Sequence, residues 1–105
     1  MIVAIVKFGL SRPASREQAK EAFIATSSKY LNLKGLTQKY YLISDDGLTA
    51  GGVYIWESKA DAMKLYTADW EAFILEKYGS RPSVTYFESP VVVDNKTGKV
   101  MTEFE

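Results

Sequence analysis

The chain of 105 residues is 47% hydrophobic and 25% charged, and its formal net charge is zero. This length and composition indicate a single globular domain that spans residues 1–105. The balanced charge does not favour a nucleic-acid partner, and without a long apolar run we expect no membrane-spanning helix. The apolar start also lacks the basic region and cleavage site of a signal peptide, so we expect a cytoplasmic protein.

The sequence contains neither cysteine nor histidine. Disulfides, thiolate nucleophiles and iron–sulfur sites are therefore absent, and so are the commonest general base, transition-metal ligand and haem ligand. No Ser/His/Asp or Cys/His arrangement is possible, and we expect no metal and no other cofactor. Any chemistry must rest on Tyr, Trp, Lys, Arg, carboxylate and amide side chains.

The first part of the chain predicts a strand followed by a helix. Residues 2–8 form a short apolar, β-branched run typical of a buried strand, and the segment up to Pro13 breaks it. Ser15 and Gln18 have the spacing of a capping box, which predicts a helix from Ser15 to about Tyr30. Its apolar stripe consists of Ala19, Ala22, Phe23, Thr26 and Tyr30.

Residues 36–58 carry the clearest structural signal. Two runs rich in Tyr, Ile, Leu, Val and Trp flank Asp46-Gly47, a dipeptide that favours the tight primed turn of a β-hairpin. A turn centred there pairs Asp45 with Leu48, Ile43 with Ala50, Tyr41 with Gly52, Lys39 with Tyr54 and Thr37 with Trp56. The adjacent Gly51 and Gly52 leave two interpretations: Gly52 makes room for the Tyr41 ring, or the missing side chains open the floor of a pocket.

Both faces of this hairpin are mainly apolar. A sheet of this kind must be covered on both sides, and the chain has helices enough for only one. The second face therefore predicts a partner, most simply another copy of the chain. A bulge at the two glycines would move Lys39 and Tyr41 to the face opposite Tyr54 and Trp56.

The remaining chain predicts one more helix and one more long strand. Ser58 and Asp61 have the spacing of a helix start, and Gly79 ends that helix. Residues 83–87 predict the fourth strand, which Pro90 ends. Residues 91–93 continue extended, residues 95–99 form a turn, and residues 100–104 either pair back or reach a neighbouring molecule.

The resulting order, β-α-β-β-α-β, is that of an α+β, ferredoxin-like sandwich in which two helices cover one face of an antiparallel sheet. Right-handed crossovers give the strand order 4-1-3-2. Two such sheets that meet through their bare faces form a dimeric α-β barrel. We therefore expect a homodimer through the open sheet face, with the C-terminal extension, residues 91–105, as a candidate part of the interface.

Three segments carry a family resemblance: AGGVYIWE at residues 50–57, LYTADW at residues 65–70, and residues 83–95 with their YF and SPVVV motifs. Together they resemble the YdhR-like monooxygenases of the dimeric α-β barrel superfamily. The resemblance implies oxidation of an aromatic polyketide without metal or flavin, as in distant relatives. Haem enzymes of that superfamily rely on a histidine, which this chain lacks.

The candidate substrate-binding residues are aromatic: Tyr41, Tyr54, Trp56, Tyr66, Trp70 and Tyr86. Tyr66 and Trp70 are four residues apart, which places them on one face of a continuous helix. An aromatic cavity with hydroxyl and indole donors suits a flat, hydroxylated ligand such as an aromatic small molecule. The alternative is that these side chains form the core between sheet and helices.

Three charged residues are the candidate catalytic groups. Lys39 and Arg81 are the cations that would stabilise a substrate anion, and Asp69 is the carboxylate that would act as base. The alternative is that all three are exposed charges. The sequence thus predicts a cofactor-independent monooxygenase-like enzyme for an aromatic or polyketide-like molecule; a non-catalytic binding or dimerisation module, or an isomerase or lyase, on the same fold remains the alternative.

Overall fold

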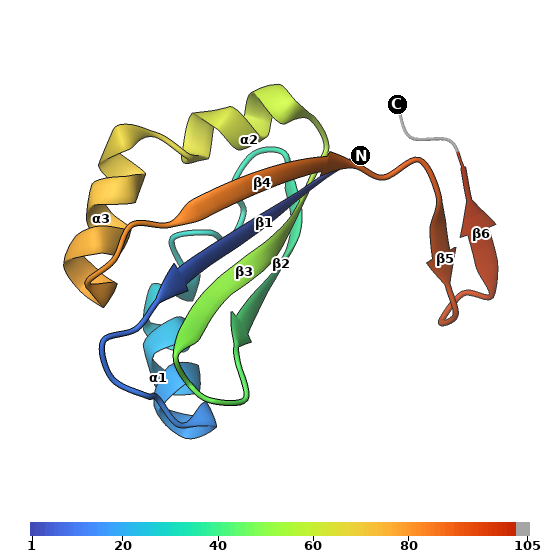
Figure 1. Cartoon of the computed structure of the whole chain (residues 1–105). Coiled ribbons are helices and arrows are strands. Elements are labelled where there is room, and N and C mark those ends of the chain that lie inside the picture. The colour runs from blue at the N-terminus through green and yellow to red at the C-terminus, as the bar shows by residue number, and fades with distance from the viewer. Residues whose placement is uncertain (103–105) are drawn as a thin grey trace.

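The computed structural model describes residues 1–102. Its elements, labelled in Figure 1, are β1 (Ile2–Gly9), α1 (Arg16–Ser27), β2 (Leu36–Ile43), β3 (Thr49–Trp56), α2 (Lys59–Leu65), α3 (Ala68–Tyr78), β4 (Ser83–Glu88), β5 (Val92–Asp94) and β6 (Lys99–Met101). The first seven form the body of the molecule, and β5 and β6 form a separate hairpin that extends from it.

The body contains one antiparallel four-stranded sheet in the order β2-β3-β1-β4. This order, with helices connecting β1 to β2 and β3 to β4, confirms the predicted α+β, ferredoxin-like fold. In β1 the residues Ile2, Ala4, Val6 and Phe8 are buried, whereas the residues between them are less buried or exposed. This alternation with a period of two places the core between the sheet and the helices.

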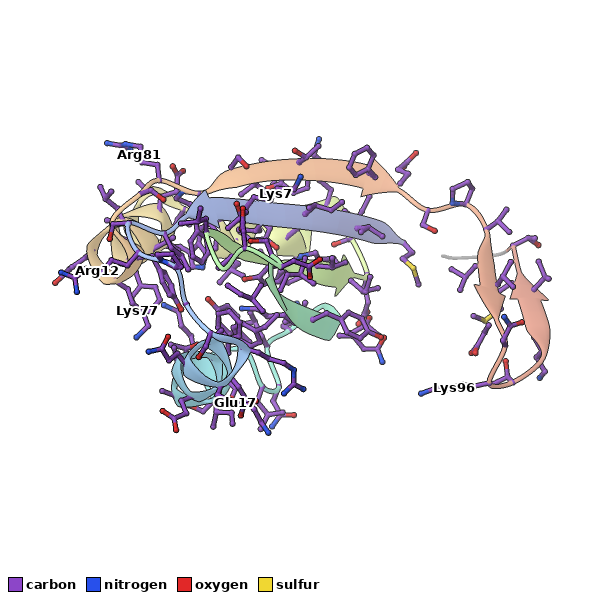
Figure 2. The ribbon with its side chains drawn as sticks, turned by 60° about the horizontal axis from the view of Figure 1, so that its bottom comes forward. Lys7, Arg12, Glu17, Lys77, Arg81 and Lys96 are labelled. Carbon is purple, nitrogen blue, oxygen red and sulfur yellow. The ribbon has the colours of Figure 1, made fainter. Side chains whose placement is uncertain are left out.

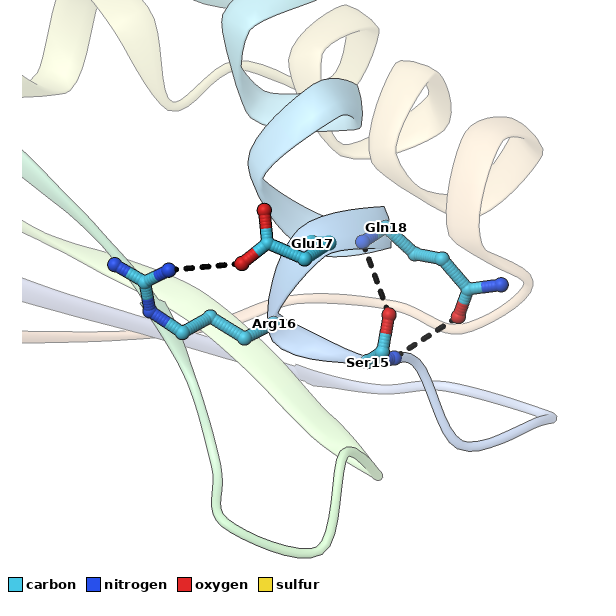
Figure 3. A network of polar contacts seen from close by, with 4 residues as sticks. All are labelled: Ser15, Arg16, Glu17 and Gln18. Carbon is cyan, nitrogen blue, oxygen red and sulfur yellow. Dashed lines mark hydrogen bonds and ion pairs between the residues drawn. The ribbon is translucent and has the colours of Figure 1, made fainter.

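The capping box at Ser15 is confirmed. The Ser15 hydroxyl accepts a hydrogen bond from the Gln18 N–H at 3.1 Å, and the Gln18 side-chain oxygen accepts one from the Ser15 N–H at 2.9 Å (Figure 3). The helix ends at Ser27, earlier than predicted, and Ser27 donates its hydroxyl to the Ile24 carbonyl at 2.8 Å, a bond that competes with helix continuation. A turn then carries Tyr30 into the core.

The second predicted helix is two helices, so the prediction of one continuous helix from Ser58 to Gly79 is wrong. Ser58 caps α2 as expected, but Tyr66 leaves the helical conformation with a ψ of 63°. Thr67 then starts α3 by accepting the Trp70 N–H with its hydroxyl at 3.3 Å. Gly79 ends α3 with a φ of 87°, as predicted.

The register of the β2–β3 hairpin is confirmed for most of its length. Ile43 pairs with Ala50, Tyr41 with Gly52 and Lys39 with Tyr54. At the far end Leu36, rather than Thr37, pairs with Trp56, because the register shifts between Leu36 and Gln38. The irregularity therefore lies away from the two glycines, and Lys39 and Tyr41 stay on the face of Tyr54.

The turn of this hairpin is wider than the predicted primed turn. Gly47 has a φ of 74°, but Asp46 does not adopt the positive φ that a primed turn requires at both positions. The Gly47 N–H donates to the Ser44 carbonyl at 2.9 Å, and the Asp46 carboxylate accepts from the Leu48 N–H at 3.0 Å. Asp45 and Leu48 consequently belong to the loop and do not pair as predicted.

The C-terminal segment pairs back on itself, one of the two predicted outcomes. Val93 pairs with Val100 and Asp94 with Lys99, and the hairpin projects away from the sheet (Figure 1). Val91, Val93 and Val100 are exposed. Phe104 lies outside the described residues, so its predicted place in this strand is not tested.

The sheet face opposite the helices carries apolar side chains, and no helix within residues 1–102 covers them. We call it the open sheet face; its residues include Val3, Ile5, Leu42, Val53, Ile55 and Phe87. Phe87 is 52% exposed and Leu42 is 39% exposed. Among residues 1–102 no helix has the length and apolarity needed to cross a membrane.

Candidate functional site

The six predicted aromatic residues lie together between the sheet and the helices. They are Tyr41, Tyr54, Trp56, Tyr66, Trp70 and Tyr86. The Tyr66 ring lies among four of them, with centroid distances of 4.9 Å to Trp70, 5.4 Å to Tyr54, 5.9 Å to Trp56 and 6.0 Å to Tyr86. Tyr66 and Trp70 meet across the break between α2 and α3, not along one continuous helix.

Both indole groups donate hydrogen bonds within this cluster. Trp56 Nε1 donates to the Tyr66 hydroxyl at 3.0 Å, and Trp70 Nε1 donates to the Tyr30 hydroxyl at 3.2 Å. Burial raises the pKa of Tyr54 and Tyr66 above the ordinary value for tyrosine. Their hydroxyls therefore stay protonated near neutral pH, and the cluster offers hydroxyl groups rather than phenolates.

Lys39 is the predicted charged residue that reaches the aromatic residues. Its Nζ lies 3.3 Å from the ring centroid of Tyr30, 3.8 Å from that of Tyr41 and 4.5 Å from that of Tyr54. We call these three rings the Lys39 cage. Within residues 1–102 no carboxylate forms an ion pair with Lys39.

The cage changes the protonation of the lysine. Burial, and to a smaller extent the positive charge of Lys29, lowers the pKa of Lys39 from 10.5 to about 7. The ring faces act in the opposite direction, because they attract the charged form. Near neutral pH the amine is therefore available both as a neutral base or nucleophile and as a cation that can stabilise an anion.

Several residues of this site were missed by the sequence analysis: Tyr30, Phe23, Thr26 and Tyr78. The Tyr41 ring stacks on Phe23 at 4.6 Å, and its hydroxyl bonds to the Thr26 hydroxyl at 3.0 Å. Burial raises the pKa of Tyr78 to about 12. The apolar stripe of the first helix contains Phe23, Thr26 and Tyr30, and that stripe was the available signal for them.

Asp69 and Arg81 do not join the cluster, since both are exposed. Asp69 lies in the first turn of α3, where its neighbour Trp70 is buried; successive helical residues point in different directions. Arg81 projects outward from the loop before β4 (Figure 2). Of the three predicted catalytic groups, the structure brings Lys39 alone to the aromatic residues.

The space around Lys39 is nearly filled on the inner side and open on the other. An internal void of about 10 Å³ touches Lys39 and the cage, which is room for one water molecule at most. A groove of about 340 Å³ lies beside it, between the turn after α1 and the first half of β2. Tyr30, Lys39 and Tyr41 line both, so they separate the groove from the interior.

The two glycines of β3 serve close packing. A Cβ added at Gly52 would lie 3.1 Å from the Tyr40 carbonyl oxygen, 3.1 Å from the Tyr54 ring and 3.4 Å from Lys39 Cε, so the space beside Gly52 is filled. A Cβ added at Gly51 would overlap the Val6 carbonyl oxygen of β1. Gly51 borders the void of about 10 Å³, and neither glycine lines the groove beside Lys39. Among residues 1–102 no cluster of three or more carboxylates suited to a metal ion is present.

No protein-family model and no curated protein matches the chain significantly. Several solved structures share its fold, and three of them each cover 84% of the chain. The ActVA-Orf6 monooxygenase of Streptomyces coelicolor, in complex with nanaomycin D, has a TM-score of 0.61 and 20% identity over 86% of its length. A mutant of SnoaB, a cofactor-independent oxygenase from Streptomyces nogalater, has a TM-score of 0.60 and 13% identity over 91% of its length.

The third structure is a protein from Bordetella bronchiseptica, provisionally described as an antibiotic biosynthesis monooxygenase. It matches with a TM-score of 0.62 and 20% identity over 95% of its length. At these identities the similarity shows the fold. The chain therefore has the same ferredoxin-like fold as these three proteins.

Proposed function

We propose that the protein is a cofactor-independent, monooxygenase-like enzyme for an aromatic or polyketide-like small molecule, with Lys39 as its reactive side chain. The observation that carries this proposal is the Lys39 amine, which lies without a carboxylate partner among residues 1–102, between an aromatic cage and an open groove. The activities described for two proteins of the same fold support it. So do the three segments that resemble the YdhR-like family.

The groove defines the ligand that fits. Its volume of about 340 Å³ lies within the range of small-molecule sites. Tyr30 and Tyr41 give the groove an aromatic wall, while Ser27, Asn32 and Gln38 provide hydroxyl and amide groups. A flat ring system that carries hydroxyl or carbonyl groups matches this combination better than an aliphatic or strongly charged ligand.

The proposed reaction begins with proton transfer to Lys39. The neutral amine accepts the proton of a phenolic hydroxyl, and the ammonium group then stabilises the phenolate. A phenolate passes an electron to O₂ more readily than the phenol does. One oxygen atom then enters at a ring carbon that loses its hydrogen, giving a quinone, and the other leaves as water. The reaction consumes one O₂ per phenol and needs no external reductant.

Oxygen uptake tests the proposal directly. Purified protein is mixed with a panel of polyketide-like phenols while an oxygen electrode and tryptophan fluorescence are followed together. We expect saturable uptake that falls about a hundredfold in Lys39→Met, the size of effect typical for loss of a general base. Lys20, an exposed residue of α1, provides the matched control, and Lys20→Met should retain full activity.

The other outcomes are equally informative. Uptake that is unchanged in Lys39→Met would contradict the role of Lys39. Fluorescence quenching without oxygen uptake or product would indicate a small-molecule binding module, the first alternative. Product that forms at the same rate without oxygen would indicate the second alternative, an isomerase or lyase. Asp69 and Arg81 have no role in this mechanism because both side chains are exposed.

The proposal includes a homodimer formed through the open sheet face. The supporting observations are the uncovered apolar residues on that face and the C-terminal hairpin, whose exposed Val93 and Val100 extend beyond the body. A second copy would cover the face with its own open sheet face, and the two hairpins would extend the contact. Burial of both apolar surfaces would drive the association.

Sedimentation equilibrium tests this assembly. The wild-type protein should be a dimer at micromolar concentration. Val53→Lys, on the open sheet face, should give a folded monomer. Ile24→Lys, on the exposed side of α1, should remain dimeric, because Ile24 is 61% exposed but lies on the helical side. A monomeric wild-type protein, or a dimer unaffected by Val53→Lys, would contradict the proposed interface.

A further inference from the structure

Lys39 has the surroundings of a nucleophile as well as those of a base. Three other lysines, Lys29, Lys59 and Lys77, lie over aromatic rings, at 3.9 Å from Phe73, 5.3 Å from Tyr86 and 5.8 Å from Tyr78. Each contacts one ring and is exposed, so water solvates its ammonium group. Lys39 instead lies among three rings and is largely removed from water. It is also the lysine that lines the groove beside the cage.

We propose that Lys39 captures aromatic aldehydes and ketones covalently, through an imine between its Nζ and the carbonyl carbon of a ligand in the groove. Tyr30 and Tyr41 line the same groove as Lys39, so a flat carbonyl compound that packs against this aromatic wall lies beside the lysine side chain. This reaction requires no oxygen. It therefore stands or fails separately from the oxygenase proposal.

The step is a condensation without change of oxidation state. The nitrogen lone pair attacks the carbonyl carbon, and the carbinolamine that forms loses its oxygen as water together with the two amine hydrogens. A carbon–nitrogen double bond remains. The void behind the amine, about 10 Å³, is too small for the ligand, so the carbonyl compound approaches Lys39 from the groove.

The charges near Nζ favour the neutral, nucleophilic amine. The titratable groups that face it are Lys29 and Tyr30 from the turn after α1, Tyr41 from β2, Tyr54 from β3 and Tyr78 from α3. Lys29 is positive, and no carboxylate among residues 1–102 opposes it. The pKa values of Tyr41, Tyr54 and Tyr78 are raised by burial, so these hydroxyls stay neutral below pH 9.

Reductive trapping tests the proposal. The protein is incubated without oxygen at pH 7 with 6-methoxy-2-naphthaldehyde and sodium cyanoborohydride, and the labelled lysines are identified by peptide mass spectrometry. This aldehyde has no phenol, so the proposed oxygenase chemistry cannot act on it. We expect Lys39 to be labelled at least about tenfold faster than any exposed lysine, because ordinary lysines are almost fully protonated at pH 7.

A pH series and matched variants test whether the labelling depends on the neutral amine of Lys39. The ratio of the labelling rate of Lys39 to that of an exposed lysine should fall more than about tenfold between pH 7 and pH 9. The reason is that exposed lysines begin to lose their protons over this range. Peptide mass spectrometry should find the adduct at position 39 in the wild type and in Lys20→Arg, and none at that position in Lys39→Arg. An aliphatic aldehyde such as propanal should label Lys39 at least about threefold more slowly, because it makes less contact with the aromatic wall of the groove.

Adducts spread evenly over the lysines, or a Lys39 that stays unlabelled, would overturn the proposal; both are read from the wild-type protein and do not depend on a variant that folds. Equal rates with propanal would overturn the aromatic selectivity. Labelling of Lys39 in a protein that shows no oxygen uptake with phenols would leave this proposal standing and reject the oxygenase. Oxygen uptake with phenols in a protein whose Lys39 stays unlabelled would reject this proposal and leave the oxygenase proposal standing.

Discussion

The burial of Lys39 predicts that the stability of the protein rises with pH above neutrality. In the unfolded chain a lysine keeps its proton up to about pH 10.5, whereas burial lowers the pKa of folded Lys39 to about 7. Between these values the unfolded state binds more protons than the folded state, so raising the pH favours folding. Below pH 7 both states are protonated and this contribution to the pH dependence disappears.

The size of the effect follows from the two pKa values. At about 1.4 kcal/mol per pH unit, the full difference between pKa values of 10.5 and about 7 corresponds to about 5 kcal/mol. The part that falls between pH 7 and pH 9 is about 2 kcal/mol. The attraction of the ammonium group to the cage rings works against burial, so these values are upper limits. Tyrosines with raised pKa values lower stability only above about pH 10, outside this window.

Urea denaturation between pH 6 and pH 9, followed by tryptophan fluorescence, measures this dependence. The free energy of unfolding should rise by about 2 kcal/mol from pH 7 to pH 9 in the wild type and in the control Lys20→Met. Lys39→Met, which fills the cage with an uncharged chain of similar length, should be more stable than the wild type at pH 7 and should lose the slope. A wild type without the slope, or a Lys39→Met variant that retains it, would refute the reasoning.

Three further substitutions test the packing around the site, each by urea denaturation. Gly51→Ala should destabilise by about 1–3 kcal/mol or prevent folding, because its Cβ would overlap the Val6 carbonyl oxygen; an unchanged stability would show that β1 adjusts freely. Tyr66→Phe should destabilise by about 1–2 kcal/mol, because it removes the acceptor of the buried Trp56 Nε1–H. Thr67→Ala should destabilise by about 1 kcal/mol through loss of the α3 cap, whereas Thr67→Ser should not.

The break between α2 and α3 is central to the site although it lies far from Lys39 in the sequence. Tyr66 ends one helix, and Thr67 begins the next by accepting the Trp70 N–H. This arrangement brings the Tyr66 ring against Trp70 at 4.9 Å and its hydroxyl within 3.0 Å of Trp56 Nε1. Both indoles of the aromatic cluster are therefore hydrogen bonded. The bond from Trp70 Nε1 to the Tyr30 hydroxyl holds one ring of the Lys39 cage in place.

The sequence by itself determined the fold of this protein. The alternation of apolar residues in β1 and the hairpin, the Ser15 capping box and the glycine at position 79 are local signals, and local signals determine element order and most of the register. They also identified the aromatic residues that form the cluster. The helix break was missed because Thr67 lies within a run that helical periodicity also fits, and the capping bond that selects the break is visible only in three dimensions.

Only the tertiary structure decided which charged residue belongs to the site. The sequence offered all three charged residues as candidates, Lys39 and Arg81 as cations and Asp69 as base. Their burial depends on contacts between segments distant in sequence: the turn that carries Tyr30 into the core closes the cage over Lys39, while Asp69 and Arg81 remain exposed. The lowered pKa of Lys39 arises from this enclosure, because desolvation is a property of the folded surroundings and not of the residue.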